Sequence, residues 1–245
     1  MTARRMPYLI WVLTWCLHGL PGLGVGLGLG IGATMWPTTV LAEGPALVQP
    51  DAAAGVSIKT QRSYQDALLL DKAWALPVAA SYKPHIEFQR NGSFCGPTSL
   101  ANVQHSQGQA GDQSTVLDGT GFHTWLGYLP KGLTLDELAD IARQKLGKRV
   151  TVMRGLDLAG FRQQLKLAND PSRRYVINFS RQPLFGAGGG HHSPIAGYLA
   201  DEDLVLVLDV NSDFGPWLVK PERLWAAMNT VDDSSHKPRG LLLIN

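Results

Sequence analysis

The chain has 245 residues, of which 44% are hydrophobic, and its formal net charge is +2. Every acidic residue, and every Lys or Arg except Arg4 and Arg5, lies between residues 43 and 245, so this stretch is formally neutral. The charge balance excludes the strongly basic surface typical of nucleic-acid-binding proteins, and a stretch of about 200 residues has the length of one ordinary domain.

Residues 1–42 predict a secretory signal. Arg4 and Arg5 are followed by an uncharged stretch rich in Leu, Gly and Trp, with small residues at positions 40 and 42 before Glu43. The stretch is long enough to span a bilayer, so an uncleaved anchor is the alternative, although glycine at every second position from 22 to 32 disfavours a stable helix. Both readings predict export, to a bacterial periplasm. Residues 43–62 predict a linker to a domain that covers residues 63–245.

The first part of this domain has mainly helical patterns. Residues 75–88 contain two prolines and predict extended chain, whereas 104–123 are polar and rich in Gly and predict a loop. Thr134 and Glu137 form a capping box that starts a helix, and Gly147 ends it. The predicted elements in chain order are helices at 64–74, 95–103 and 135–146, a strand at 150–153 and a helix at 156–168.

Strands dominate the second part. The Gly-rich residues 182–190 predict a loop, and the acidic residues 201–203 predict a turn between two strands. The predicted strands are 174–179, 192–199, 204–210 and 240–244, with a short helix at 221–228. Helices first and antiparallel strands later predict an α+β domain with two unlike halves.

Cys95 is the only cysteine outside the signal segment. An unpaired thiol in an exported protein is a liability unless it is buried or used, so a structural cysteine is the simpler alternative to a nucleophile. The sequence favours the nucleophile, because Gly96 and Pro97 suit the first turn of a helix that begins at Cys95. The helix dipole would then stabilise a thiolate, and free N–H groups there could bind an oxyanion. The side-chain amide of Gln89, six residues earlier, is a candidate second donor.

The predicted base is one of two adjacent histidines, His191 and His192, that open a strand after the glycine run ending at Gly190. Successive strand residues face opposite sides, so we expect at most one of them at the site, which also argues against a zinc site with Cys95. The other histidines of residues 43–245 lie in polar or loop-like sequence and are interpreted as surface residues: His85, His105, His123 and His236.

A histidine base needs an orienting acceptor, and Asp209 is the candidate. It ends the apolar run 204–210, where a lone buried carboxylate would be costly. Folding the two strands about residues 201–203 brings Asp209 beside His191. An aspartate at an exposed strand end is the alternative. The chain order Gln89, Cys95, His191, Asp209 is that of papain-like enzymes.

At these residues the chain resembles the phytochelatin synthases and their one-domain bacterial relatives, which act mainly as glutathione hydrolases. Gln89 to Gly96 matches the family motif Q-x5-C-G, and residues 190–198 match G-H-x-S-P-[IL]-x-[GA]-Y, with His191 in the catalytic place and His192 in the variable one. Residues 208–210 match L-D-V. The similarity covers roughly residues 70–245.

The resemblance implies a papain-like fold and acyl transfer on glutathione. Cys95 would attack the Cys–Gly bond, glycine would leave, and water or a second glutathione would take up the γ-glutamylcysteinyl group. Arg181 and Arg239 match arginines that bind the γ-glutamyl carboxylate, and Gly190 leaves room for the substrate. No tightly bound cofactor is implied; cadmium or zinc would enter as metal–thiolate substrates.

The expected partners are glutathione and its metal complexes, with homodimerisation left open, no nucleic acid, and membrane contact only through an uncleaved N-terminal segment. Where the family has a basic residue, lysine and tyrosine after the aspartate, residues 212–215 read Ser-Asp-Phe-Gly, which favours hydrolysis over phytochelatin synthesis. The Cys-rich C-terminal domain of the plant enzymes is also absent. Two alternatives remain: a papain-like peptidase of the bacteriocin-leader type, and a non-catalytic thiol- or metal-binding protein.

Overall fold

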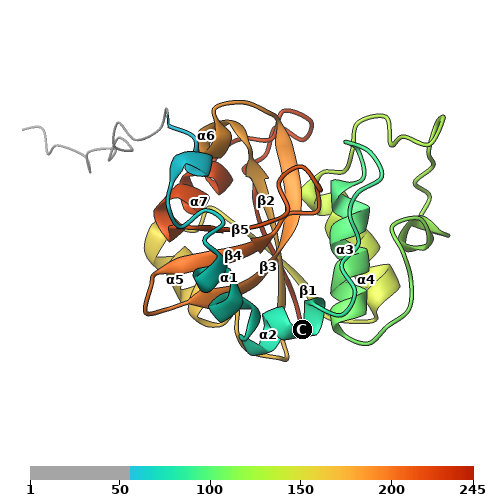
Figure 1. Cartoon of the computed structure of the whole chain (residues 1–245). Helices are drawn as coiled ribbons and strands as arrows, with labels where there is room; N and C mark the ends of the chain where they lie inside the picture. The colour runs from blue at the N-terminus through green and yellow to red at the C-terminus, as the bar shows by residue number, and fades with distance from the viewer. Residues whose placement is uncertain (1–55) are drawn as a thin grey trace, which may run out of the picture. The chain divides into compact units, whose positions relative to one another are not determined.

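The computed structural model describes residues 56–245 (Figure 1). The predicted signal segment, and the linker as far as residue 55, lie outside the described residues. Residues 56–62 were also predicted to be linker, but they contain the 3₁₀ helix η2 (Ile58–Thr60), whose Ile58 is completely buried. This apolar anchor, which the polar surroundings concealed, places the start of ordered structure before residue 63.

A six-stranded antiparallel sheet forms the centre of the described domain. The strands lie in the order β1-β6-β2-β3-β4-β5. Their bounds are β1 (Val150–Arg154), β2 (Arg174–Ser180), β3 (Gly190–Leu199), β4 (Leu204–Leu208), β5 (Pro216–Val219) and β6 (Gly240–Ile244). The sheet and the helices confirm the predicted α+β class.

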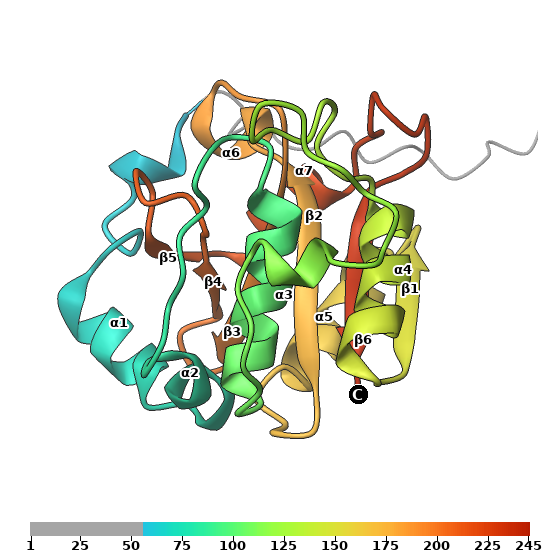
Figure 2. The same cartoon turned by 90° about the vertical axis from the view of Figure 1, so that its right-hand side faces the viewer.

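Helices cover both faces of the sheet (Figures 1 and 2). One face packs against α1 (Ala67–Trp74), α2 (Pro77–Tyr82), α3 (Cys95–Ser106) and α4 (Leu135–Leu146). The other face packs against α5 (Leu158–Lys166), α6 (Gln182–Phe185) and α7 (Pro221–Met228). In β4, Leu206 faces the first core and Val207 the second, so a strand buried on both faces reads as a continuous apolar run.

Helix α3 begins at Cys95, as predicted, and packs closely on α4. Gly96 permits this approach, because a Cβ at that position would lie 3.1 Å from Leu138 and 3.2 Å from Leu133. The α4 capping box is present: the Thr134 hydroxyl accepts from the Glu137 N–H, and the Glu137 carboxylate accepts from the Thr134 N–H. The cap fixes the start of α4 and therefore the wall against which the first turn of α3 rests.

Three short elements differ from the sequence prediction. Residues 77–82 form α2 instead of extended chain, because Pro77 occupies the first helical position, where its missing N–H costs nothing. Residues 182–185 form the one-turn helix α6 within the predicted loop. Strand β5 was not predicted, since its four residues begin with the proline of a Gly-Pro pair and pair only with β4 at the sheet edge. No helix in residues 56–245 is long and apolar enough to cross a membrane.

Candidate active site

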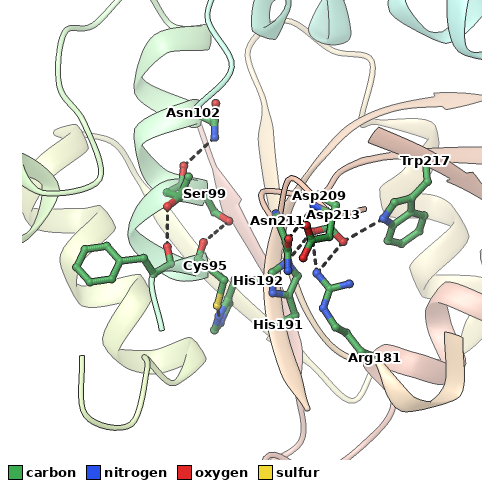
Figure 3. A network of polar contacts seen from close by, with 12 residues as sticks. Cys95, Ser99, Asn102, Arg181, His191, His192, Asp209, Asn211, Asp213 and Trp217 are labelled. Carbon is green, nitrogen blue, oxygen red and sulfur yellow. Dashed lines mark hydrogen bonds and ion pairs between the residues drawn. The ribbon is translucent and has the colours of Figure 1, made fainter. Parts of the chain in front are cut away.

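Cys95 is the first residue of α3 and is 7% exposed. The N-cap residue, Phe94, offers no side-chain hydrogen bond to the helix, so the N–H groups of the first turn face the site uncapped by a side chain. The Cys95 carbonyl accepts a hydrogen bond of 2.7 Å from Ser99 Oγ one turn later. The sulfur is therefore held at the positive end of a well-ordered helix (Figure 3).

His192 lies beside this sulfur, with its Nδ1 3.8 Å from Cys95 Sγ (Figure 3). His191 lies beside Asp209, and it too lowers the pKa of the thiol. The expectation that only one of the pair could lie at the site is wrong. The two residues pair with different positions of β2, as alternation requires, but they open the strand at the end of the sheet, next to the start of α3, where both rings interact with the thiol.

Asp209 orients His191. It directly follows β4, is completely buried, and its Oδ1 lies 2.9 Å from His191 Nε2. The same carboxylate accepts hydrogen bonds from Arg181 Nη2, at 2.7 and 2.9 Å, from Trp217 Nε1 at 3.1 Å and from the Asn211 N–H at 2.9 Å. Burial alone would raise the Asp209 pKa, but His191 and Arg181 outweigh it and lower the pKa to about 2. Asp209 is therefore an anion at neutral pH.

The electrostatics of the site favour a thiolate. Burial raises the pKa of Cys95, but hydrogen bonding from His191 and His192 outweighs burial and holds the pKa well below its ordinary value. Burial lowers the pKa of His191, but Asp209 and then Cys95 outweigh it, so this pKa is raised. A thiol pKa that falls while the imidazole pKa rises describes a thiolate–imidazolium pair, the activated state of a cysteine nucleophile.

A cavity of about 840 Å³ opens onto the sulfur. Its volume is in the range of small-molecule sites. Cys95 and His192 line it, together with apolar residues of the 125–133 segment such as Trp125 and Leu129. It also has four charged lining residues: Lys131, Asp232, Asp233 and Arg239. Of the predicted substrate-binding residues, Gly190 and Arg239 line this cavity, whereas Arg181 does not. The structure therefore separates the two arginines that the sequence placed together.

Arg181 lies behind the histidine pair. Besides Asp209, its guanidinium contacts the Phe214 ring, 3.9 Å from the ring centroid. Arg239 reaches the cavity from the segment before β6, and its Nη1 lies 3.2 Å from Asp232 Oδ1 and 3.2 Å from Asn178 Oδ1. The Arg239 guanidinium packs directly against Gly190, because a Cβ at residue 190 would lie only 2.9 Å from Arg239 Cζ.

The Gln89 side chain makes no hydrogen bond within the described residues, and its Oε1 is buried. Its backbone N–H donates to the Val210 carbonyl at 2.7 Å, which ties the segment before α3 to the residue after Asp209. The backbone of Gln89 thus joins the two halves of the site, while its side chain does not line the cavity.

Asn178 was not among the predicted site residues. It lies on β2 opposite His192, is 3% exposed, and its Nδ2 is 3.0 Å from His192 Nε2. The signal was present in the sequence: an asparagine inside the apolar strand Tyr-Val-Ile-Asn-Phe needs buried polar partners. Trp217, which donates to Asp209, and Asp232, which pairs with Arg239, were missed too, because no sequence pattern marks these contacts. Within residues 56–245, no group of three or more His, Cys, Asp or Glu side chains could hold a metal ion.

The geometry can be compared with known proteins. The family model for phytochelatin synthase matches residues 122–241, a range that includes His191, Asp209, Arg181 and Arg239. Residues 122–241 therefore form a phytochelatin synthase domain. Cys95 and Gln89 lie before the matched range, and the structure joins them to it.

The curated relatives that match this chain include plant glutathione gamma-glutamylcysteinyltransferases. Glutathione gamma-glutamylcysteinyltransferase 3 of Lotus japonicus is 34% identical over 119 residues, which cover 47% of this chain and 25% of that protein. Glutathione gamma-glutamylcysteinyltransferase 2 of Arabidopsis thaliana is 31% identical over 179 residues, which cover 66% of this chain and 38% of that protein. The chain thus matches well under half the length of either plant protein.

Solved structures with a similar fold include a C39-like peptidase from Bacillus anthracis, at a TM-score of 0.48 and 15% identity over 67% of this chain and 95% of that chain. The peptidase domain of Streptococcus ComA has a TM-score of 0.44 at 15% identity, over 65% of this chain and 96% of that domain. The chain itself has the predicted papain-like arrangement, with a cysteine at a helix N-terminus packed against an antiparallel sheet that carries the histidine and the aspartate.

Proposed function

We propose that this protein transfers the γ-glutamylcysteinyl group of glutathione through a thioester on Cys95, and that water is its favoured acceptor. The observation that carries the proposal is the buried Cys95 thiol with its lowered pKa, placed beside the His191–Asp209 pair and open to a cavity, in a chain whose residues 122–241 form a phytochelatin synthase domain. The curated relatives named glutathione gamma-glutamylcysteinyltransferase support glutathione as the substrate.

The charges of the cavity suit this substrate. Glutathione carries two carboxylates and one ammonium group, and the cavity presents Lys131 and Arg239 as cations and Asp232 and Asp233 as anions. Arg239 can pair with the γ-glutamyl carboxylate, because a guanidinium binds a carboxylate through parallel N–H donors. The neighbouring aspartates then suit the ammonium on the same carbon.

In the proposed reaction, the Cys95 thiolate attacks the carbonyl carbon of the Cys–Gly peptide bond. The negative oxygen that forms is stabilised by N–H groups at the start of α3 and by the side-chain amide of Gln89. His191 gives its proton to the glycine nitrogen, the C–N bond breaks, and glycine leaves. His191 then takes a proton from water, which attacks the thioester and releases γ-glutamylcysteine.

Water is the favoured acceptor because residues 212–215 contribute no cationic side chain of their own for a second glutathione. Ser212 and Asp213 occupy the turn where the family has basic residues, and Phe214 packs on Arg181. Cadmium or zinc would enter, on this proposal, bound to the thiol of glutathione as part of the substrate.

The test uses the full chain and its Cys95→Ala and Cys95→Ser variants with glutathione, followed by assays of glycine and γ-glutamylcysteine and by intact-protein mass spectrometry. We expect glycine release and a γ-glutamylcysteinyl adduct in the wild type and neither in the variants. A parallel incubation with cadmium–glutathione measures phytochelatin formation, which we expect to be minor.

Equal glycine release by wild type and Cys95→Ala would overturn the proposal. Cleavage of double-glycine leader peptides without glutathione turnover would identify a peptidase instead. Binding of thiols or metals without any covalent adduct would identify a binding protein.

A further inference from the structure

His192 has no role in the proposed reaction, although its Nδ1 lies within hydrogen-bond distance of the nucleophilic sulfur. It is 2% exposed, its Nδ1 is 3.8 Å from Cys95 Sγ, and it lines the cavity. His191 differs from it, because the His191 Nε2 faces a carboxylate. The two imidazole rings therefore differ in the group that contacts the Nε2 atom of each ring.

The group behind His192 is the Asn178 amide, and its orientation is fixed by two partners. Arg239 can only donate, so the Asn178 atom 3.2 Å from Arg239 Nη1 is the oxygen. The His191 carbonyl can only accept, and it lies 3.4 Å from Asn178 Nδ2. Both contacts leave the Asn178 NH₂ group facing His192 Nε2 at 3.0 Å.

The amide orientation determines the tautomer of His192. Because Nε2 accepts from an N–H donor, it carries no proton, and the ring proton lies on Nδ1, which faces the sulfur. Protonation of His192 would set two N–H groups against each other across the 3.0 Å contact. His192 is thus held as a neutral donor, in contrast to His191, whose carboxylate partner favours the imidazolium.

We propose that His192 is a second catalytic imidazole, which donates its Nδ1–H to the Cys95 sulfur and takes no part in proton transfer, while His191 carries the proton. Asn178 and Arg239 are the positioning residues that fix its tautomer. The inference rests on the part of the proposed function that makes Cys95 the nucleophile, and it does not depend on which acyl group Cys95 receives.

The donor acts where the sulfur is negative. It stabilises the thiolate before attack and loses most of this interaction in the neutral thioester. When the thioester is hydrolysed, the C–S bond breaks, the electron pair returns to Sγ, and the water proton goes to His191. His192 then stabilises the leaving thiolate, so its loss should slow deacylation more than acylation and increase the steady-state acyl-enzyme.

Other charges reach the same region and must be held constant in any test. Asp209 and its partner Arg181 lie behind His191. The cavity wall adds Lys131, Asp233 and the Arg239–Asp232 pair. All of them are retained in variants of His192 alone.

The test measures the rate of Cys95 alkylation by iodoacetamide against pH in the full chain, for wild type, His192→Phe, His192→Asn and His192→Gln. The Asn variant places an amide N–H near the Nδ1 position, and the Gln variant places one near Nε2. We expect the midpoint of the profile to rise by about one pH unit or more in the Phe and Gln variants, and by clearly less in the Asn variant. A wild-type midpoint in His192→Phe, with unchanged circular dichroism, would overturn the proposal.

A second measurement is made on the wild-type protein and so does not depend on whether a site variant folds. Nitrogen-15 NMR of the full chain labelled in histidine reports the tautomer of each ring, with assignment by loss of the signal in His192→Asn or by its contact with the Asn178 amide. We expect the neutral His192 ring to carry its proton on Nδ1. A proton on Nε2 would overturn the proposal. If alkylation and NMR agree with it but no glycine is released from glutathione, the substrate proposal fails and the role of His192 stands.

Discussion

The Asp209 carboxylate is bound by a single nitrogen of Arg181, Nη2, at 2.7 Å to Oδ1 and 2.9 Å to Oδ2 (Figure 3). Both side chains are buried, with 10% of Arg181 and none of Asp209 exposed. The same carboxylate orients His191. The contact therefore connects Arg181 to the proton carrier of the site, at a distance from the cavity where a substrate would bind.

We expect Arg181→Gln and Arg239→Gln to have different kinetic effects. Loss of Arg181 leaves the buried Asp209 carboxylate with one cation fewer. We therefore expect kcat for glycine release to fall by about tenfold or more, with little change in KM. The free energy of unfolding should fall by about 3–5 kcal/mol. Loss of Arg239 removes a cation from the cavity wall, so KM should rise. Steady-state kinetics with glutathione and chemical denaturation of both variants provide the measurement.

The sequence interpretation of Arg181 as a carboxylate-binding residue makes the opposite prediction. If Arg181→Gln raises KM as much as Arg239→Gln does and leaves kcat intact, Arg181 contacts the substrate after all. Arg181→Lys separates charge from shape, because lysine keeps the cation but loses the contact of the planar guanidinium with Phe214.

Asp209→Asn should narrow the pH range of activity. Asp209 is the main cause of the raised pKa of His191, so the amide should let His191 lose its proton at a lower pH. The alkaline limb of the kcat profile should therefore move to lower pH, and kcat should fall by about 10²–10⁴-fold because the ring loses its orienting acceptor. An alkaline limb at the wild-type position would show that another group carries this proton.

The lowered pKa of Asp209 also predicts acid sensitivity of the fold. The folded value is about 2 against an ordinary 3.8, so the contribution to stability is complete above pH 4 and is lost as the pH falls through about 2. A shift of that size corresponds to about 2 kcal/mol. The wild type should lose this much more unfolding free energy between pH 5 and 2 than Asp209→Asn does, measured by urea denaturation.

Asp203→Asn is the matched control for that experiment. Its carboxylate also has a pKa of about 2, owing mainly to Arg162, but its side chain is 31% exposed, and solvent screening reduces the value of such a pair. We expect this variant to differ less from the wild type, in the stability lost between pH 5 and 2, than Asp209→Asn does. An equal difference in both variants would mean that burial of Asp209 adds nothing.

The sequence predicted Cys95, His191 and Asp209, which the structure brings together, because each belongs to a local pattern. A glycine and a proline mark the first turn at Cys95, a glycine run opens the strand of His191, and a carboxylate in an apolar strand marks Asp209. The element bounds follow from the same signals, and α4 is fixed by its capping box. Each of these features depends on a few neighbouring residues, so it can be recognised in the local sequence.

The partners of those atoms could not be predicted in the same way, because they depend on strand register and on side chains far apart in the chain. Asn178 faces His192 only because β2 and β3 pair in one register. Arg181 meets Asp209 across 28 residues of sequence. The expectation that one histidine alone reaches the site failed for a related reason, since alternation holds along a strand but does not say where the strand ends relative to α3.

Gly190→Ala tests the link between the glycine run and the cavity. A Cβ at residue 190 would lie 2.9 Å from Arg239 Cζ, closer than carbon atoms approach without displacement. The flexible end of Arg239 can move away, so the fold should survive, but the guanidinium would leave Asn178 and Asp232. We expect KM for glutathione to rise about as much as in Arg239→Gln.

Gly190→Ala should also release the Asn178 amide, since Arg239 no longer fixes its oxygen. The His192 tautomer would then be less strictly held, and the alkylation midpoint of Cys95 should rise, though by less than in His192→Phe. Gly189→Ala is the control, because a Cβ there would meet no atom within 4 Å. If both alanine variants behave alike in KM and in alkylation, the glycine at 190 acts only through chain flexibility, and the contact with Arg239 does not position the site.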